Sequence, residues 1–200
     1  VKRGPDSVKN FEDFKNNVPV FDYDSIFKTY WHKCLDGQRD ITWPGKVKHF
    51  ALSSGTSGAP SKQIPVTKDM IKAIKRTSIR QMIALSAYKN ISSQALEKGY
   101  LMLGGSIDLT QVNDHFEGDL SGITVGKMPF WFEKFFKPGK AISQEKSWDK
   151  KLQEITLNAS NWDVAFVAGV PAWIQILFGR IIAFHKVENI HQIWPNLVAF

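Results

Sequence analysis

A run of hydroxyl and glycine residues near position 55 has the composition of a phosphate-binding loop. Its sequence is Ser53-Ser54-Gly55-Thr56-Ser57-Gly58-Ala59-Pro60-Ser61-Lys62. The glycines allow backbone N–H groups to approach a ligand closely, and a run of such donors can form an anion-binding nest. The hydroxyl groups add donors, and Lys62 adds a positive charge. The segment therefore suits a polyphosphate, although the same composition is typical of a polar surface turn.

Two other motifs fit this segment less well. A Walker loop requires Gly-Lys-Ser/Thr in direct succession, but Lys62 lies between Ser61 and Gln63. A nucleophile elbow requires Gly-x-Ser-x-Gly, and the segment Gly55-Thr56-Ser57-Gly58 is one residue too short. The pattern therefore favours phosphate binding by a loop of another type.

The order of the residues resembles the phosphate loop of the adenylate-forming superfamily. The paired serines, followed by Lys62 and Pro65, are similar to those of a narrower group, the acyl-acid-amido synthetases of the plant auxin-responsive (Gretchen Hagen) family and their bacterial homologues. Weaker matches follow in that family's order: Val18-Pro19-Val20 with Tyr23-Asp24, Gly169-Val170-Pro171-Ala172-Trp173, and Trp194-Pro195-Asn196-Leu197. The chain thus resembles a bacterial-type member of this family along most of its length.

The resemblance implies an ATP-dependent ligase that activates a carboxylate as an acyl-adenylate and then joins it to the amine of an amino acid. ATP and Mg²⁺ are the implied cofactors. Phosphate contacts are implied for Ser53, Ser54, Gly55, Thr56, Ser57, Gly58 and Lys62, and a catalytic role is implied for Lys62. Two alternatives remain open, an acyl-CoA synthetase with a thiol acceptor and a basic nucleic-acid- or protein-binding module.

The resemblance also predicts where the acid binds and how much of the enzyme is present. Arg80 lies near the place where the plant enzymes have an arginine that meets the acyl carboxylate, with an offset uncertain by one residue. Gly104, Gly105, Pro171 and Trp173 are expected at strand ends or helix starts, where α/β folds bind ligands. Residues 1–200 are expected to be part of the N-terminal adenylation domain, truncated at both ends. The C-terminal domain is then absent, and the fragment alone is expected to be inactive.

Composition and charge agree with an ordinary globular domain. The 200 residues carry a formal net charge of +7, which suits anionic ligands, and no nucleic-acid-binding motif is present. No apolar run reaches the roughly 18 residues of a membrane span, and the single cysteine, Cys34, excludes an internal disulfide. His32 and Cys34 lack a second pair at ligand spacing, so no metal site is predicted. We expect a cytoplasmic protein whose partners are ATP, a small carboxylic acid and an amino acid, with no nucleic acid and no membrane.

The hydrophobic pattern predicts an α/β fold, a mixed and mostly parallel sheet with helices on both faces. Strands are expected over residues 47–52, 63–67, 99–103, 164–168 and 197–200, with a polar loop over 108–122. Helices are expected over residues 11–15, 24–35, 67 to about 86–90, 147–157 and 171–186. The aromatic cluster at 128–136 is expected to be core or the lining of an acyl pocket.

Overall fold

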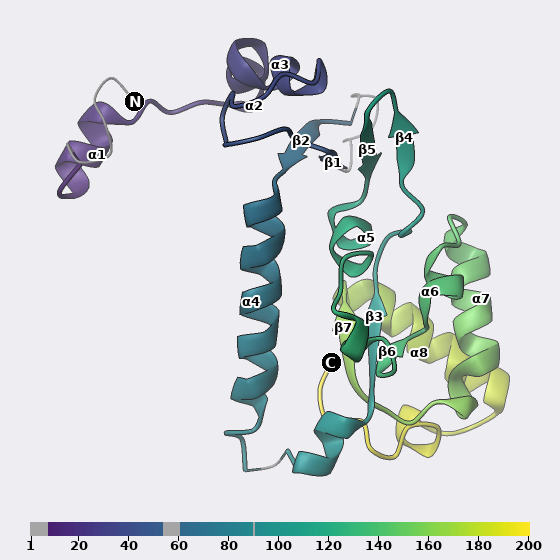
Figure 1. The fold of residues 1–200 in the computed structure, drawn as a ribbon. Coiled ribbons are helices and arrows are strands. Elements are labelled where there is room, and N and C mark those ends of the chain that lie inside the picture. The colour runs from purple at the N-terminus through teal and green to yellow at the C-terminus, as the bar shows by residue number, and fades with distance from the viewer. Residues whose placement is uncertain (1–7, 54–60, 90) are drawn as a thin grey trace. The chain divides into compact units, whose positions relative to one another are not determined.

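The computed structural model describes residues 8–53, 61–89 and 91–200. These residues form two compact units, Val1–Lys46 and Val47–Phe200. Figure 1 shows the ribbon with its helices and strands labelled. The units are described separately below, beginning with the smaller one.

The first unit is helical. Helix α1 (Phe11–Asn17) begins at Asn10, whose Oδ1 accepts a hydrogen bond from the backbone N–H of Asp13 at 2.8 Å. The helix expected over residues 24–35 is present but not uniform. It consists of α2 (Tyr23–Ile26), a π-helical turn η2 (Phe27–Trp31) and α3 (His32–Leu35), and it ends before Gly37 with φ 78°. A π turn places one extra residue in the helix, which an apolar pattern of helical spacing does not reveal.

The second unit begins with a four-stranded sheet in the order β2-β1-β5-β4. Strands β1 (His49–Leu52) and β2 (Gln63–Val66) are antiparallel, with Leu52 opposite Gln63, and β1 runs parallel to β5 (His115–Gly118). Strand β4 (Thr110–Val112) pairs antiparallel with β5. The strands expected on either side of the glycine-rich segment are therefore confirmed.

The polar loop expected over residues 108–122 is wrong. This stretch contains β4, β5 and the start of helix α5 (Leu120–Val125). Strand β4 pairs with β5 across a two-residue turn at Asn113-Asp114, with Asn113 at φ 50°, and β5 also pairs with β1, which lies more than 60 positions earlier in the sequence. The sequence analysis missed both the turn signal of Asn113-Asp114 and the long-range pairing.

A second sheet contains three parallel strands in the order β6-β3-β7. These are β3 (Gly99–Leu103), β6 (Phe136–Lys137) and β7 (Val164–Gly169). Helices α7 (Trp148–Asn158) and α8 (Pro171–His185) pack on one face, and α4 (Lys68–Leu85) contributes Met82 and Leu85 to the cluster on the other. Figure 1 shows α4 on the opposite side of this sheet from α7 and α8. The α/β class with helices on both faces is confirmed, with the strands divided between two sheets.

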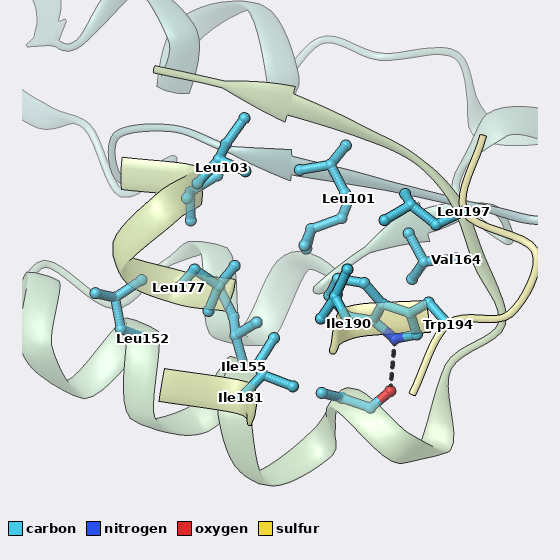
Figure 2. Packing of buried hydrophobic residues seen from close by; sticks show 13 residues of the cluster. Leu101, Leu103, Leu152, Ile155, Val164, Leu177, Ile181, Ile190, Trp194 and Leu197 are labelled. Carbon is cyan, nitrogen blue, oxygen red and sulfur yellow. Dashed lines mark hydrogen bonds between the residues drawn. The ribbon is translucent and has the colours of Figure 1, made fainter. Parts of the chain in front are cut away.

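The main hydrophobic core lies between the three-stranded sheet, α7 and α8 (Figure 2). Leu101 and Leu103 of the central strand meet Leu152 and Ile155 of α7, and all four are buried. Trp194 is also fully buried there, and its indole Nε1–H donates a hydrogen bond to the Ala159 carbonyl at 2.8 Å. The dashed line in Figure 2 marks this bond. The pair anchors the segment after α8 to the end of α7.

The remaining elements are short. Helix α6 spans Lys140–Ser143, and short 3-10 helices span Ser93–Glu97, Phe130–Phe132, Ala159–Asn161 and Ile190–Gln192. The strand expected over residues 197–200 is wrong. Only Ala199 forms an isolated parallel bridge, to Phe166, although Val167 N and Ala199 O are joined by a hydrogen bond of 3.0 Å. One bridge does not make a ladder, so this segment lies against β7 without becoming a strand.

Gly122 in α5 is a position where a methyl group has no room. A Cβ at Gly122 would overlap the backbone carbonyl of Ser106, so Gly122→Ala is expected to lower the free energy of unfolding by about 2 kcal/mol or more. A matched control is Gly179→Ala in α8, where a Cβ meets nothing within 4 Å and a gain of about 0.5–1 kcal/mol is expected. Urea denaturation of both variants measures the difference. Equal stabilities would show that the Ser106 backbone moves aside freely.

Candidate functional site

One backbone and one side-chain hydrogen bond close the base of the glycine-rich segment. Ser53 N donates to Lys62 O at 3.0 Å, and Lys62 N donates to Ser53 Oγ at 3.1 Å. These contacts continue the β1–β2 hairpin by one residue on each side, which places Ser53 opposite Lys62, whose side chain is exposed. Ser54, Gly55, Thr56, Ser57 and Gly58 lie outside the described residues, so their phosphate contacts stay a prediction.

A chain of polar side chains lies on the same sheet as the loop base. Gln63 Nε2 donates to Glu117 Oε1 at 2.6 Å, and the same oxygen lies 3.1 Å from His115 Nε2. His115 is buried and Glu117 is nearly so. Gln63 directly follows Lys62, so this chain fixes the strand at the point where the loop ends. Sequence analysis did not predict this chain, because His115 and Glu117 fall in the stretch expected to be a loop.

A small cavity of about 210 Å³ lies at the carboxyl edge of the three-stranded sheet. Gly104 and Gly105 follow β3, Pro138 follows β6, and Gly169 ends β7, so all three strand ends contribute to its wall. Parallel sheets bind ligands at this edge. The cavity therefore occupies a position where the fold class favours a ligand.

The turn after β3 is held closely against the start of α5. Gly105 N donates to Ser121 Oγ at 3.0 Å, and a Cβ on Gly105 would overlap the side chain of Asp119. Glycine is required here by this close approach and not by an unusual φ. The turn was predicted as a ligand-permissive element, and its two glycines line the small cavity.

Lys151 of α7 also lines this cavity, and the sequence analysis missed it. Its side chain is only 4% exposed, and its Nζ donates to Gly104 O at 3.2 Å. Burial lowers the pKa of the Lys151 ammonium, while the negative charges of Asp119 and Glu145 act in the opposite direction. A buried lysine in a cavity, with its pKa lowered by desolvation, is a candidate functional residue.

A larger cavity of about 420 Å³ lies between α4, the three-stranded sheet and the segment after α5. Its lining is mainly aliphatic and aromatic, including Ile71, Ile74, Met82, Leu85, Trp131 and Phe132. The apolar stripe expected on the helix after Thr67 thus faces a cavity, and part of the aromatic cluster at 128–136 lines it while Phe136 is core. Met102, Thr124, Val125 and Ala168 line both cavities.

The other residues predicted to bind the acid are placed differently. Among the described residues, Arg80, Pro171 and Trp173 line neither of these two cavities. Arg80 is exposed on α4, whereas its neighbour Gln81 lines the larger cavity. Pro171 begins α8, and Trp173 packs on Trp148 with 4.5 Å between ring centroids. Acid binding by these three residues stays a prediction.

Metal-binding clusters and membrane-spanning helices are both absent from the described residues. No group of three or more His, Cys, Asp or Glu side chains in residues 8–53, 61–89 and 91–200 could hold a metal ion. His32 Nδ1 lies 3.0 Å from the Phe27 carbonyl, and burial raises the pKa of the Cys34 thiol. Within the same part of the chain, no helix is both long and apolar enough to cross a bilayer.

Comparison with known families decides the classification of this chain. The GH3 family N-terminal domain matches residues 2–150, about three quarters of the sequence. The chain belongs to the GH3 family. Lys151 lies one residue beyond the matched range, whereas the loop, the hairpin and the turn after β3 lie within it.

Relatives of this GH3 chain include two amido synthetases of Arabidopsis thaliana. Indole-3-acetic acid-amido synthetase GH3.17 is 30% identical over 96 residues, which are 48% of this chain and 15% of the relative. Indole-3-acetic acid-amido synthetase GH3.15 is 33% identical over 81 residues, which are 40% of this chain and 13% of the relative. The chain is therefore similar to a small part of each of these proteins.

Solved GH3 structures have the same fold. The AtGH3.15 acyl acid amido synthetase in complex with 2,4-DB superposes on 87% of this chain with a TM-score of 0.61 and 20% identity. A second structure, the GH3.15 acyl acid amido synthetase, covers 84% with a TM-score of 0.60 and 21% identity. In both cases the match spans 30% of the solved chain. At 20–21% sequence identity, these structural matches show a shared fold only.

Proposed function

We propose that the protein containing this chain is an ATP-dependent acyl-acid-amido synthetase. Membership of the GH3 family supports this proposal, as do the names of the similar Arabidopsis proteins, both indole-3-acetic acid-amido synthetases. The observation that carries it is the connection between the predicted phosphate loop and an apolar cavity. Strand β2 leaves the loop at Lys62 and leads through Thr67 directly into α4, whose apolar residues line that cavity.

The proposed reaction has two steps. A carboxylate oxygen of the acid attacks the α-phosphorus of ATP, the bond to the bridging oxygen of the β-phosphate breaks, and pyrophosphate leaves. The amine of an amino acid then attacks the acyl carbonyl, AMP leaves with its electron pair, and the nitrogen loses a proton. The first step places negative charge on the pyrophosphate, and a preorganised cation and N–H donors stabilise that charge.

The loop is proposed to supply those groups. Ser53 and Lys62 stand at its base, and Lys62 brings the charge. Mg²⁺ is proposed to arrive with the nucleotide phosphates, as is usual for this ion.

The larger cavity is proposed to hold the body of the acid. A cavity of about 420 Å³ lies within the range of small-molecule sites, and its aromatic and aliphatic walls suit an apolar acid. Indole-3-acetic acid, named for two relatives, is a reasonable first candidate. We further propose that the protein acts in the cytoplasm and that its acceptor is an amino acid.

Pyrophosphate exchange with a panel of acids tests this function on the full-length protein. We expect exchange with at least one apolar carboxylic acid, and release of AMP when an amino acid is added. ATP hydrolysis to ADP without exchange would instead indicate a kinase or ATPase. Product formed with coenzyme A and not with amino acids would indicate a thiol acceptor.

A further inference from the structure

Three polar side chains are connected across the four-stranded sheet. Gln63 of β2 and Glu117 of β5 lie on either side of β1 in the strand order β2-β1-β5-β4, and Gln63 Nε2 donates to Glu117 Oε1 at 2.6 Å. His115 Nε2 lies 3.1 Å from the same oxygen. A carboxylate accepts hydrogen bonds and donates none, so both neighbours act as its donors. The Gln63 side chain is thereby tied across the central strand to β5.

Glu117 is itself held by a buried histidine. His115 is only 4% exposed, and its ring meets the Phe50 ring edge to face with 4.8 Å between centroids. Its Nδ1 is buried without a hydrogen-bond partner among the described residues, so within that part of the chain Glu117 is the polar partner of the ring. Close packing leaves such a ring little freedom to turn. The carboxylate that receives Gln63 is therefore a fixed acceptor.

Alternation along β2 places Gln63 and Lys62 on opposite faces of the sheet. Lys62 extends the β1–β2 pairing by one residue, so its side chain shares a face with that of Val66. This face carries the hydrophobic cluster of Ala51, Val66 and Ile123, which joins the sheet to α5. Fixing Gln63 on one face therefore fixes the direction in which Lys62 leaves the strand on the other.

The face that packs against α5 is also the one nearer to the proposed acid site. Thr124 and Val125 of α5 line the larger cavity, and so do residues of α4, the helix that follows β2. A lysine on this face lies on the α5 side of the sheet, whereas a lysine on the opposite face would lie beside His115 and Glu117. Because a slip of one residue moves every side chain of a strand to the other face, the anchoring of Gln63 matters for Lys62.

We propose that Gln63, Glu117 and His115 are positioning residues for Lys62. This inference rests on the proposed function, in which the Lys62 ammonium stabilises the charge that develops on the departing pyrophosphate. The effect of the three side chains on the reaction passes through Lys62 and not through contact with nucleotide or acid. A displacement of about 1 Å caused by a residue away from the chemistry can cost about 100-fold in rate, so a small shift at the start of β2 is sufficient.

Gln63→Glu tests this link in the full-length protein, because it places two carboxylates where an amide and a carboxylate now meet. Exchange is measured with whichever of indole-3-acetate, benzoate and octanoate supports it best. The repulsion is expected to slow acyl-adenylate formation, measured as pyrophosphate exchange, by about 10-fold. Amide formation from preformed acyl-adenylate is expected to change by less than about 3-fold, since pyrophosphate has already left. The matched control is Gln111→Glu, the same change at an exposed position on β4, which should resemble the wild type.

Combining Gln63→Glu with Lys62→Ala shows whether the effect passes through the lysine. Residues that act as one unit give non-additive losses, so Gln63→Glu is expected to slow exchange by less than about 2-fold in the Lys62→Ala background. A loss of about 10-fold in both backgrounds would mean that Gln63 acts independently of Lys62, and it would overturn the proposal.

Adding Glu117→Gln to Gln63→Glu restores a donor and an acceptor with reversed polarity. The amide nitrogen at position 117 can donate to the carboxylate at position 63, and its second N–H can donate to His115 in the other tautomer. The exchange rate is therefore expected to recover by at least about 3-fold over Gln63→Glu alone. Absence of recovery would show that the contact with Glu117 is not what positions the strand.

A second variant serves if Gln63→Glu does not fold. Gln63→Met removes the donor without adding a charge, and it is expected to slow exchange by about 5-fold in the wild-type background. In the Lys62→Ala background the same change is expected to slow exchange by less than about 2-fold. Equal losses in the two backgrounds count against the proposal in the same way as for Gln63→Glu.

The outcomes separate the positioning role from the proposed function. Absence of exchange with every acid overturns the proposed function and the positioning role with it. Where exchange occurs, a wild-type rate in the Gln63 variant or in Lys62→Ala overturns only the positioning role. A parallel fall of both half-reactions and of the Tm in the Gln63 variant shows a structural role and overturns the positioning role as well.

Discussion

Replacing Lys62 by alanine is expected to slow acyl-adenylate formation by roughly 100-fold or more, by analogy with the loss of one preorganised donor at an oxyanion hole. The side chain is exposed at the base of the loop, so its truncation should change stability by no more than about 0.5 kcal/mol. The two hydrogen bonds between the Lys62 backbone and Ser53 do not involve the lysine side chain and are expected to persist in the variant. The charge on the departing pyrophosphate, however, loses its cation.

The two half-reactions distinguish this role from a structural one. Amide formation from preformed acyl-adenylate should be nearly unchanged, because pyrophosphate has already left. Lys48→Ala, at an exposed position before the other end of β1, is the matched control and should leave both steps as in the wild type. Wild-type rates of both steps in Lys62→Ala would make Lys62 an ordinary turn residue. A parallel fall of both rates and of the Tm would make the loop structural.

Replacing Trp194 by alanine is expected to lower the free energy of unfolding by about 3–5 kcal/mol. The indole is fully buried in the main core, so its removal leaves a large cavity. It also removes the hydrogen-bond donor to the buried Ala159 carbonyl, 2.8 Å from Nε1, and leaves that acceptor without this partner.

Trp194→Phe divides this effect into its two parts. The ring keeps much of the bulk but cannot donate to Ala159, so a loss of about 1–3 kcal/mol is expected. Chemical denaturation measures both variants. A loss below about 1 kcal/mol for Trp194→Ala would mean that the core closes around the missing side chain, contrary to the expectation.

The elements that sequence reasoning predicted well are those fixed by local interactions. Thr67 and Ser147 begin helices because their hydroxyl groups accept from backbone N–H groups three residues later, Met70 N at 3.1 Å and Lys150 N at 3.5 Å. Pro171 stands at the start of α8, where a missing N–H costs nothing. Such signals lie within one turn of chain and are visible in the printed sequence.

The features that were missed depend on partners far away in the chain. Lys151 stands beside the apolar Leu152 and was indistinguishable from a solvent-facing lysine, because its burial is created by the turn at Gly104, 47 residues earlier. Strand β5 depends in part on its pairing with β1. A phosphate loop is predicted from residue order, but the hydrogen bond between Gln63, which follows this segment, and Glu117 could not be predicted, since the two residues are 54 positions apart.

The wall shared by the two cavities has a consequence for how this family can diversify. Four side chains, Met102, Thr124, Val125 and Ala168, face both spaces, whereas Ile71, Ile74 and Trp131 face only the larger one. Substitutions at positions that line only the larger cavity would change its shape and leave the small cavity unchanged. Substitutions in the shared wall would change both cavities. Under the proposed function, substitutions at the outer positions should therefore change which acid binds, while the common wall is retained.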